Sequence, residues 1–438
     1  MGFMDRKIVP SSVTYKPLLV ESKNSLVFDA SVSSKPVTWN QNARLWNGGM
    51  CDEDELRQLH LDGVDLSSEG NEWCNALSSS VQKLQVLGMS NCFLSGPVDS
   101  SLVNLHHLSF IQLNGNNLST PVPKFLARFT NLTTLRLSYC GLYGEFPSKI
   151  FQAQTLQILD LSGHQLLQGP LPNFPEDSSL ETLVLTYTSI SGRLPDSIGS
   201  VPSFSMSKNQ RQIVLFRNAP TGEIKSTRWA ELISLVYLDL WYNSLEGSIP
   251  WSLFILPSVK IIKLSDNQFS GELSGSLNVT CYQLTLLDLS SNNLGGPIPA
   301  YGFELRGLGY LSLSSNNFSG SLHIDAFQRL KNLTYLDLSH NRLSINATAS
   351  TSAMFGFPTL YTLKLASCQL SSLPEFLENQ PLRYLDLSDN QIQGEIPKWI
   401  WESKLLSYVN LSFNFFDKLG EPLPNLTYTL SVIDLHRN

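Results

Sequence analysis

From Leu84 onward, the chain repeats one pattern of apolar and polar positions, L-x-x-L-x-L-x-x-N-x-L-x-G-x-I-P. The segment 284–299 shows this pattern in nearly pure form. The early units are spaced by 24 residues, as between Leu84 and Leu108. A constant period of this length predicts a stack of small supersecondary units, each contacting only its neighbours, rather than a globule with one closed core.

The register of the repeat runs along most of the chain, with an irregular unit at 56–66 in front and a disturbed stretch after Leu180. The first apolar positions of successive units are Leu84, Leu108, Leu132, Leu156, Leu180, Leu235, Val259, Leu284, Leu308, Leu333, Leu360, Leu382, Leu406 and Leu430.

Each position of the pattern has a physical role. The alternation in L-x-x-L-x-L predicts a short strand with its leucines on one face. We expect the following Asn, such as Asn292, to bond the backbone of its own bend and of the neighbouring coil. The Gly, such as Gly296, allows a backbone conformation that other residues resist, and the Ile-Pro pair favours an extended segment over a regular helix. The pattern therefore predicts an α/β solenoid with a parallel β-sheet on the concave face and a mostly irregular convex side.

Composition narrows the class of partner. The chain has 438 residues and a net charge of −7, with 15% charged residues. An acidic balance without basic clusters argues against nucleic acid as a partner. No apolar run reaches 18 residues, so the sequence predicts no membrane span within this chain. The first 20 residues lack the apolar core of a secretory signal, and Arg6 stands where a myristoylation signal needs Ser or Thr.

Eight N-x-S/T sequons nevertheless suggest an extracellular protein. Phrases such as N-L-S also arise from the repeat itself, so both explanations stand. Asn278 and Asn346 lie between repeats, where no leucine register forces them, and they favour glycosylation. The eight are Asn117, Asn131, Asn278, Asn317, Asn332, Asn346, Asn410 and Asn425.

The six cysteines fall into two groups. Cys92, Cys140 and Cys368 occupy the Asn position of their repeats, where we expect small, buried and unreactive thiols. Of the others, Cys51 and Cys74 are a candidate disulfide pair across the first coil. The absence of a C-x-x-C pair or a Cys/His cluster of metal spacing predicts no metal site, and nothing in the sequence calls for a cofactor.

The variable positions of the strand point out of the predicted concave sheet, and aromatic residues recur there. One column carries tyrosines in L-x-Y-[LV]; another, just before the Asn position, holds further aromatics. Aromatic residues on a rigid surface are typical of protein interfaces, although Tyr also packs well on any sheet face. The two columns comprise Tyr237, Tyr310, Tyr335, Tyr384 and Tyr408, and Tyr139, Tyr187, Tyr242 and Phe413 with Trp241 beside them.

An acidic column accompanies the tyrosines, at Asp160, Asp239, Asp288, Asp337, Asp386 and Asp434. We interpret it as surface consensus residues that bond neighbouring serines, such as Ser290 and Ser339, rather than as a metal or acid–base site. Basic residues that interrupt the polar face are better candidates for ligand specificity. These are Arg136, Lys260, Lys263, Lys364 and Arg383.

The full pattern, together with phrases such as Ser191–Gly199, Leu365–Leu370 and Gly394–Trp401, resembles the ectodomain of plant leucine-rich-repeat receptor-like proteins of the Ve and Cf disease-resistance classes. The resemblance covers about residues 17–438. It implies a plant-type leucine-rich-repeat superhelix on the extracellular side of the cell membrane. It also implies a protein or peptide ligand on the concave face and signalling through a partner receptor kinase, because such proteins lack a kinase of their own.

The sequence departs from this family at three places. The cysteine pair of the family's N-terminal cap is replaced by Ala43 and Arg44, although Trp46 and Cys51 match. Residues 196–224 are irregular, as after deletion of one repeat or in a plain irregular loop. The last unit stops at Asn438, and we expect an exposed strand edge there. We therefore expect an unplaced segment 1–16, a degenerate cap 17–55, and about 15–16 repeats over 56–438.

The sequence favours a ligand-recognition domain and not an enzyme, since no catalytic arrangement of Ser/His/Asp, Cys/His or paired carboxylates stands out. The alternatives are a secreted inhibitor or decoy of a pathogen enzyme, and a truncated gene product without function.

Overall fold

The computed structural model describes residues 49–438 except 53–54, 67, 69–71, 147, 176, 200–210, 225–228, 231, 275–282, 300–304, 347–356, 358 and 421–428. The segment 1–48, which contains most of the expected cap, lies outside this part. The chain forms two compact units. The first comprises residues 1–207 and 217–219, and the second comprises 208–216 and 220–438. The division falls in the stretch that the sequence marks as irregular.

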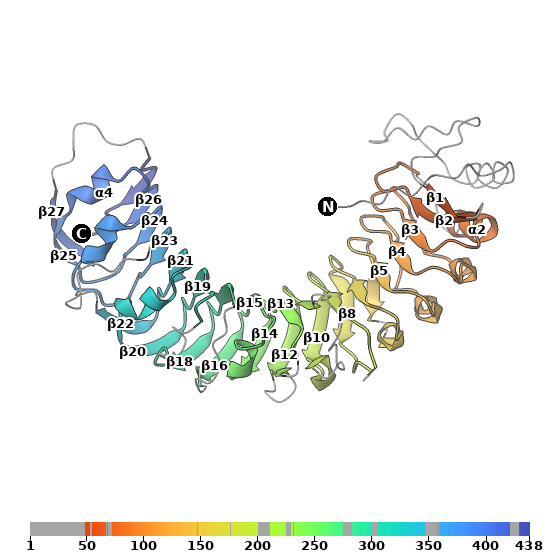
Figure 1. The fold of residues 1–438 in the computed structure, drawn as a ribbon, viewed down its shortest axis with the longest axis horizontal. Helices are drawn as coiled ribbons and strands as arrows, with labels where there is room; N and C mark the ends of the chain where they lie inside the picture. The colour runs from red at the N-terminus through yellow and green to blue at the C-terminus, as the bar shows by residue number, and fades with distance from the viewer. Residues whose placement is uncertain are drawn as a thin grey trace. The chain divides into compact units, whose positions relative to one another are not determined.

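Both units are built on one motif. Each repeat contributes a strand of about three residues to a main parallel ladder, and the chain then turns away through a left-handed residue before the Asn position. In many repeats a second strand follows, and then a 3₁₀ turn. Figure 1 shows these coils side by side, with the labelled main strands β13, β15, β19 and β21 along the inner edge of the second unit.

In the first unit, the main ladder runs in chain order, and β1 (Gly49–Asp52) pairs antiparallel with its first strand. The ladder consists of β2 (Glu55–His60), β3 (Val86–Gly88), β4 (Phe110–Gln112), β5 (Thr134–Arg136), β7 (Ile158–Asp160) and β9 (Thr182–Val184). A second parallel ladder joins β6 (Tyr143–Glu145), β8 (Leu166–Pro170) and β10 (Ser189–Arg193).

In the second unit, the main ladder consists of β11 (Arg211–Val214), β13 (Leu235–Asp239), β15 (Ile261–Lys263), β17 (Leu286–Asp288), β19 (Tyr310–Ser312), β21 (Tyr335–Asp337), β23 (Thr362–Lys364), β24 (Tyr384–Asp386), β26 (Tyr408–Asn410) and β28 (Val432–Asp434). The second-ladder strands are β12 (Ala219–Glu223), β14 (Ser244–Gly247), β16 (Gln268–Glu272), β18 (Asn293–Gly296), β20 (Asn317–His323) and β22 (Arg342–Asn346). Two more strands, β25 (Gln393–Ile396) and β27 (Phe415–Leu419), form a separate parallel pair.

Helical segments are short. The α-helices among the described residues are α2 (Glu72–Ser80) and α4 (Lys398–Glu402). The 3₁₀ turns are η1 (Ser100–Asn104), η2 (Lys124–Arg128), η3 (Ser148–Gln152), η4 (Asp196–Gly199), η5 (Trp251–Leu253), η7 (Ile324–Arg329) and η8 (Glu375–Asn379). The predicted solenoid with a parallel sheet is confirmed. Outside that sheet the coils are more regular than expected, because the segments that run from the Asn position to about the Gly position form the second ladders.

Two features hold neighbouring coils together. The consensus leucines, for instance Leu284 and Leu289, are completely buried between coils. The Asn position supplies a polar ladder: Asn292 Nδ2 donates to Leu264 O at 2.9 Å and to Leu289 O at 3.1 Å, and its Oδ1 accepts from Phe269 N at 3.0 Å. Each such side chain therefore satisfies backbone groups of two coils at once, as the sequence predicted.

Candidate functional site

The acidic column caps its own strand ends. Asp288 Oδ1 accepts from Ser290 N at 3.1 Å and from Ser290 Oγ at 2.6 Å. Asp386 bonds Ser388 in the same way, at 3.0 and 2.7 Å. The interpretation of these aspartates as serine-bonding surface residues is confirmed. Within the described residues, no group of three or more His, Cys, Asp or Glu is placed to hold a metal ion.

Five neighbouring strands of the second unit bring most of the tyrosine column into one continuous feature, which we call the tyrosine strip. Tyr310 and Tyr335 stack with ring centroids 4.1 Å apart and planes 10° apart. Tyr384 and Tyr408 stack in the same way, at 4.1 Å and 4°. The strip comprises Tyr310, Tyr335, Lys364, Tyr384 and Tyr408, on β19, β21, β23, β24 and β26.

Lys364 joins the two tyrosine pairs. Between the pairs, β23 carries Thr362, in register with Tyr335 and Tyr384. The ammonium of Lys364 lies 5.4 Å from the Tyr335 ring centroid and 5.1 Å from that of Tyr384. It also pairs with Asp337 Oδ2 at 3.8 Å. Cations in this position are attracted by the faces of both rings, so the strip is ordered by stacking and by one central charge.

The phenol groups of Tyr310, Tyr335 and Tyr384 stay protonated at neutral pH. Burial, followed by the charge of Asp337, raises the pKa of Tyr335 to about 12. Burial and neighbouring tyrosines also raise the pKa of Tyr310 and of Tyr384. The Tyr335 hydroxyl donates to Asp337 Oδ2 at 3.3 Å. The strip therefore presents partly exposed ring edges and hydroxyl groups that can donate hydrogen bonds.

A second cluster, the tryptophan cluster, consists of Phe216, Tyr237, Asp239, Trp241 and Lys263. Trp241 packs against Phe216 with centroids 5.6 Å apart, and its Nε1 donates to Asp266 Oδ2 at 2.7 Å. Lys263 pairs with Asp239 Oδ2 at 3.6 Å, and the Tyr237 hydroxyl donates to the same oxygen at 3.0 Å. Burial raises the pKa of Asp239. Burial alone would lower the pKa of Lys263, but the neighbouring Asp239 and Tyr237 raise it above the ordinary value.

The second aromatic column lies at the exits of the strands, where the backbone is left-handed. Tyr139, Tyr187, Tyr242 and Phe413 have φ between 53° and 55°. The Tyr139 ring is 61% exposed and lies against Gly163, where a Cβ would fall 2.5 Å from Tyr139 Cδ1. In each unit these aromatics therefore lie at the ends of the main-ladder strands and are separate from the tyrosine strip.

The basic candidates divide by position. Arg136, Lys263 and Lys364 stand in register with aspartates of the acidic column. Lys260 and Arg383 do not interrupt the column, because each directly precedes its strand. Arg383 instead stacks on Tyr361, with its Cζ 5.5 Å from the ring centroid. Tyr187 in the first unit has a comparable partner in Arg217, whose Nη1 donates to its hydroxyl at 3.0 Å.

The cysteines require one correction. Cys92, Cys140 and Cys368 are buried, as predicted. Cys74 is a buried free thiol, so the predicted pairing with Cys51 is wrong in this structure. Cys74 lies in α2, which packs against η1 of the next coil, and its Sγ accepts from Asp99 N at 3.3 Å. Burial raises the pKa of Cys74 to about 12.

Six of the eight sequon asparagines lie in the described part of the chain, whereas Asn278 and Asn425 lie outside it. Asn117, Asn131 and Asn332 are exposed, and Asn317 and Asn346 are half-buried on second-ladder strands. Asn410 lies on β26 in register with Asp386, and its Oδ1 accepts from Ser412 N at 3.1 Å. A glycan on Asn410 would stand next to Tyr408 of the tyrosine strip.

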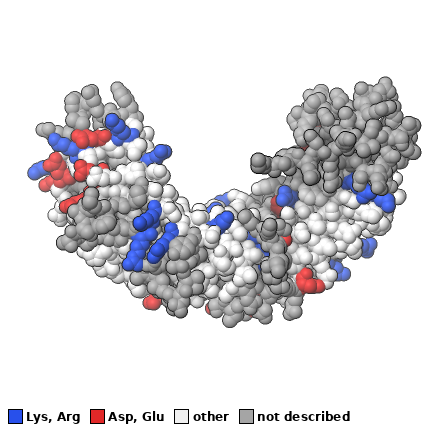
Figure 2. Space-filling view, in the orientation of Figure 1, with Lys and Arg blue, Asp and Glu red and all other residues white. Residues whose placement is uncertain are grey.

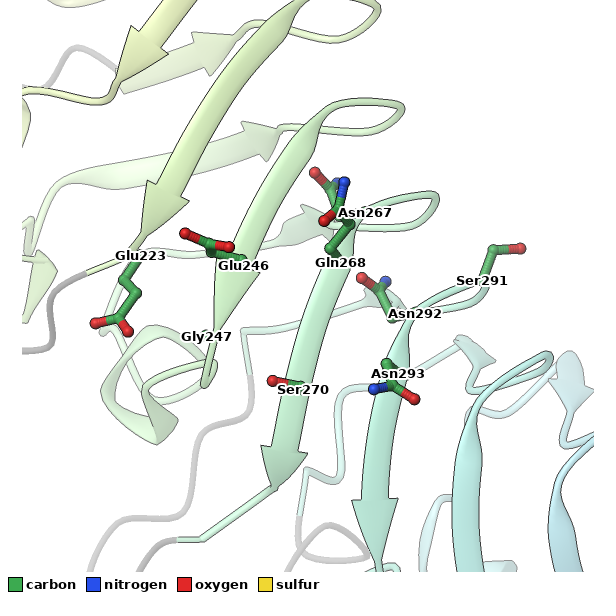
Figure 3. A pocket seen from close by; sticks show the side chains of 9 residues that line it. All are labelled: Glu223, Glu246, Gly247, Asn267, Gln268, Ser270, Ser291, Asn292 and Asn293. Carbon is green, nitrogen blue, oxygen red and sulfur yellow. The ribbon is translucent and has the colours of Figure 1, made fainter.

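Two other surfaces of the second unit contain none of the candidate residues. A polar groove of about 770 Å³ lies along β12, β14, β16 and β18 (Figure 3) and contains Glu223, Glu246 and Gln268. Its Asn267 and Asn292 are committed to backbone bonds of the Asn ladder. Figure 2 shows Lys and Arg side chains gathered near β19 and β21; there, Arg306, Arg329 and Lys331 line a cavity of about 370 Å³.

One residue of chemical interest escaped the sequence analysis. His164 occupies the Asn position of its repeat and is buried. Its Nε2 donates to Leu137 O at 2.7 Å, and its Nδ1 accepts from Leu142 N at 3.3 Å, which assigns the neutral Nε2–H tautomer. Burial lowers the pKa of His164 below its ordinary value of 6.5. Position 164 lies 24 residues after Cys140, which is one repeat, so counting the period would have shown that His164 stands in place of the consensus Asn.

In the part of the chain that the structure describes, no helix has the length and apolar character needed to span a membrane.

Comparison with known families finds the leucine-rich repeat at several places. One family model, described as leucine rich repeat, matches residues 282–343. A second model of the same description matches residues 378–396, and a third matches residues 131–153 and again residues 234–256. Among curated proteins, the chain is 46% identical over 74 residues to receptor-like protein 48 of Arabidopsis thaliana, covering 17% of this chain and 9% of that protein. It is 44% identical over 79 residues to receptor-like protein 47 of the same plant, covering 18% and 10%. The matches thus span about a tenth of these relatives.

Solved structures share the fold. A TDR receptor structure aligns with a TM-score of 0.63 and 24% identity, over 86% of this chain and 71% of that one. A leucine-rich-repeat protein of Leptospira interrogans aligns with a TM-score of 0.63 and 24% identity, over 92% and 94%. The ectodomain of the Arabidopsis thaliana membrane receptor kinase GASSHO1/SCHENGEN3, solved with CASPARIAN STRIP INTEGRITY FACTOR 2, aligns with a TM-score of 0.55 and 24% identity, over 93% and 65%. These likenesses establish the leucine-rich-repeat solenoid.

Proposed function

We propose that this chain, which belongs to the plant leucine-rich-repeat receptor-like proteins, is a ligand-recognition domain that binds a protein or peptide on its main sheet. The receptor acts at the cell surface in plant immune signalling, and it signals through a partner kinase, as the resemblance to receptor-like proteins, a class without a kinase of its own, implies. The family assignment supports the receptor class. The immune role rests on the resemblance to disease-resistance receptors in phrases such as Gly394–Trp401.

The observation that carries the binding proposal is the tyrosine strip. Tyr335 and Tyr384 are held by stacking and by Lys364, so they lose little rotamer freedom when a ligand binds. Rigid aromatic side chains at the centre of a surface are the usual anchors of protein interfaces. The five strands of the strip are spaced by about 4.8 Å, so it extends over roughly 19 Å, which matches about six residues of an extended peptide.

The test is selection of peptides from a random dodecamer display library on the whole chain, made in a secretory host. Selected peptides should lose at least about 30-fold in affinity for the Tyr335→Ala/Tyr384→Ala double variant, as expected for hot-spot residues. Tyr143→Ala is the matched control, because Tyr143 is an exposed tyrosine on the second-ladder strand β6 of the first unit. Equal loss in both variants, or loss in neither, would refute the strip as the binding surface.

The proposed dependence on a partner kinase has a separate test. The whole receptor, purified with its natural flanking sequence, should bind a kinase ectodomain only when a selected peptide is present. Ligand-independent binding of the same strength would contradict a receptor that reports ligand through that partner.

A further inference from the structure

We propose that the tyrosine strip selects a basic peptide segment and seats a Lys or Arg side chain against Tyr384, Tyr408 and Asp386. This inference rests on the proposed binding function and adds the chemistry of the ligand. It follows from the charges that flank the strip and from the contacts that the strip makes with Lys364.

The strip lies beside a column of net negative charge. The third positions of the main strands from β13 to β28 stand in register and contain five aspartates and two lysines, which leaves three negative charges. Both lysines are already paired, Lys263 with Asp239 and Lys364 with Asp337. The remaining column carboxylates on or next to the strip belong to Asp288, Asp386 and Asp434, and of these only Asp386 lies on a strand of the strip. A column of this sign attracts cationic groups placed directly against it and repels anionic ones.

Asp386 is the carboxylate best placed for a ligand. Its Oδ1 accepts both bonds from Ser388, and its Oδ2 has no side-chain partner within the described part of the chain. Asp288 differs, because its Oδ2 accepts from Ser265 Oγ at 3.0 Å. Asp386 lies on β24 together with Tyr384, directly beside the Tyr384–Tyr408 stack.

The contacts of Lys364 show that the strip accommodates a cationic side chain. Its ammonium is held by two tyrosine rings at 5.4 and 5.1 Å and by one carboxylate at 3.8 Å. A ligand cation beside Asp386 would meet its carboxylate and the hydroxyl oxygens of Tyr384 and Tyr408, because Tyr408 and Lys364 already cover the two faces of the Tyr384 ring. A ligand carboxylate in that place would meet Asp386 at close range, and Lys364 is already neutralised by Asp337.

The inference predicts opposite signs for two charge changes. Lys364→Met keeps a long apolar stem and removes one positive charge, so affinity for a basic peptide should rise. Asp386→Asn keeps the acceptor for Ser388 and removes one negative charge, so affinity should fall. For one unit charge a few ångströms away at a protein surface, each change should be roughly three- to ten-fold.

The experiment measures fluorescence anisotropy of labelled decapeptides built from Gly and Ser with three Arg, three Lys or three Glu, at physiological salt. Asp160→Asn is the matched control: Asp160 has the same serine-capping geometry on β7, where none of the strip tyrosines lies. The Arg and Lys peptides should bind the wild type and the Asp160→Asn control with equal affinity. They should bind Asp386→Asn with lower affinity and Lys364→Met with higher affinity. Equal loss at Asp160→Asn and Asp386→Asn would overturn the assigned site, since it would show only a diffuse charge effect.

Preference for the Glu peptide, with loss in Lys364→Met, would overturn the inferred charge of the ligand while leaving the strip as a binding surface. Library-selected peptides that ignore the Tyr335→Ala/Tyr384→Ala variant would instead refute the proposed function. The two failures are therefore distinguishable.

Discussion

The Asn ladder makes a quantitative prediction at Asn390, which is buried and joins two coils. Its Oδ1 accepts from Cys368 N and from Leu370 N, both at 3.0 Å. Its Nδ2 donates to Leu365 O at 2.8 Å and to Leu387 O at 2.9 Å. Asn390→Ala would leave the two buried N–H groups without their acceptor.

Each buried polar group left unsatisfied costs about 1–3 kcal/mol, so the two amides together should lower the free energy of unfolding by about 2–6 kcal/mol. Repeat arrays depart from two-state unfolding, so hydrogen exchange resolved to single amides is the better assay. Exchange at Cys368 and Leu370 should accelerate strongly, whereas coils several repeats away should change little, because each coil contacts only its neighbours.

Asn293→Ala is the control, since Asn293 is exposed on β18 and should change stability by less than about 0.5 kcal/mol. Unchanged exchange at both amides in Asn390→Ala would refute the view that this side chain satisfies them. Acceleration spread evenly over the whole chain would refute the local character of the coupling.

Three further predictions concern pH, glycosylation and thiols. The lowered pKa of His164 means that its contribution to stability is complete above pH 6.5 and falls as the pH drops below this value towards the folded-state pKa; His164→Asn should remove that part of the pH dependence in urea unfolding curves, and an unaltered pH profile would contradict it. If Asn410 carries a glycan, peptide binding should avoid the C-terminal strands, and Asn410→Gln should restore contact with Tyr408; a ligand footprint over Tyr408 in fully glycosylated protein would refute this. Iodoacetamide at pH 8 should leave Cys140 unmodified in the native chain and label it in urea, because burial raises its pKa to about 11; native labelling at the rate of a free thiol would show that this coil opens.

The sequence predicted what the repeat determines locally. Asn292 bonds two coils because the turn that follows L-x-L places its amide there, and the same turn recurs in every unit. Asp288 caps its strand through Ser290, two residues away. Such short-range relations follow from the motif alone, which is why the solenoid, the buried leucines and the serine-bonding aspartates were predictable.

Relations across strands were less accessible. Lys364 and Lys263 were identified as basic interruptions, but their pairing with Asp337 and Asp239 depends on side-chain direction across the ladder. The helix α2 turns Cys74 towards the next coil, which a reading of cysteine spacing cannot show. His164 escaped because histidine is chemically unlike the consensus Asn, although its two ring nitrogens reproduce the donor and acceptor of the amide.

The central claim is that the tyrosine strip is the ligand-binding surface, and hydroxyl-radical footprinting with mass spectrometry tests it most directly. With a library-selected peptide bound to the Asn410→Gln protein, which carries no glycan beside the strip, oxidation of Tyr335, Tyr384 and Tyr408 should fall, while that of Tyr143 on β6 should stay at its unbound rate. Protection of Tyr143 or Tyr139 with no change in the strip would contradict the account.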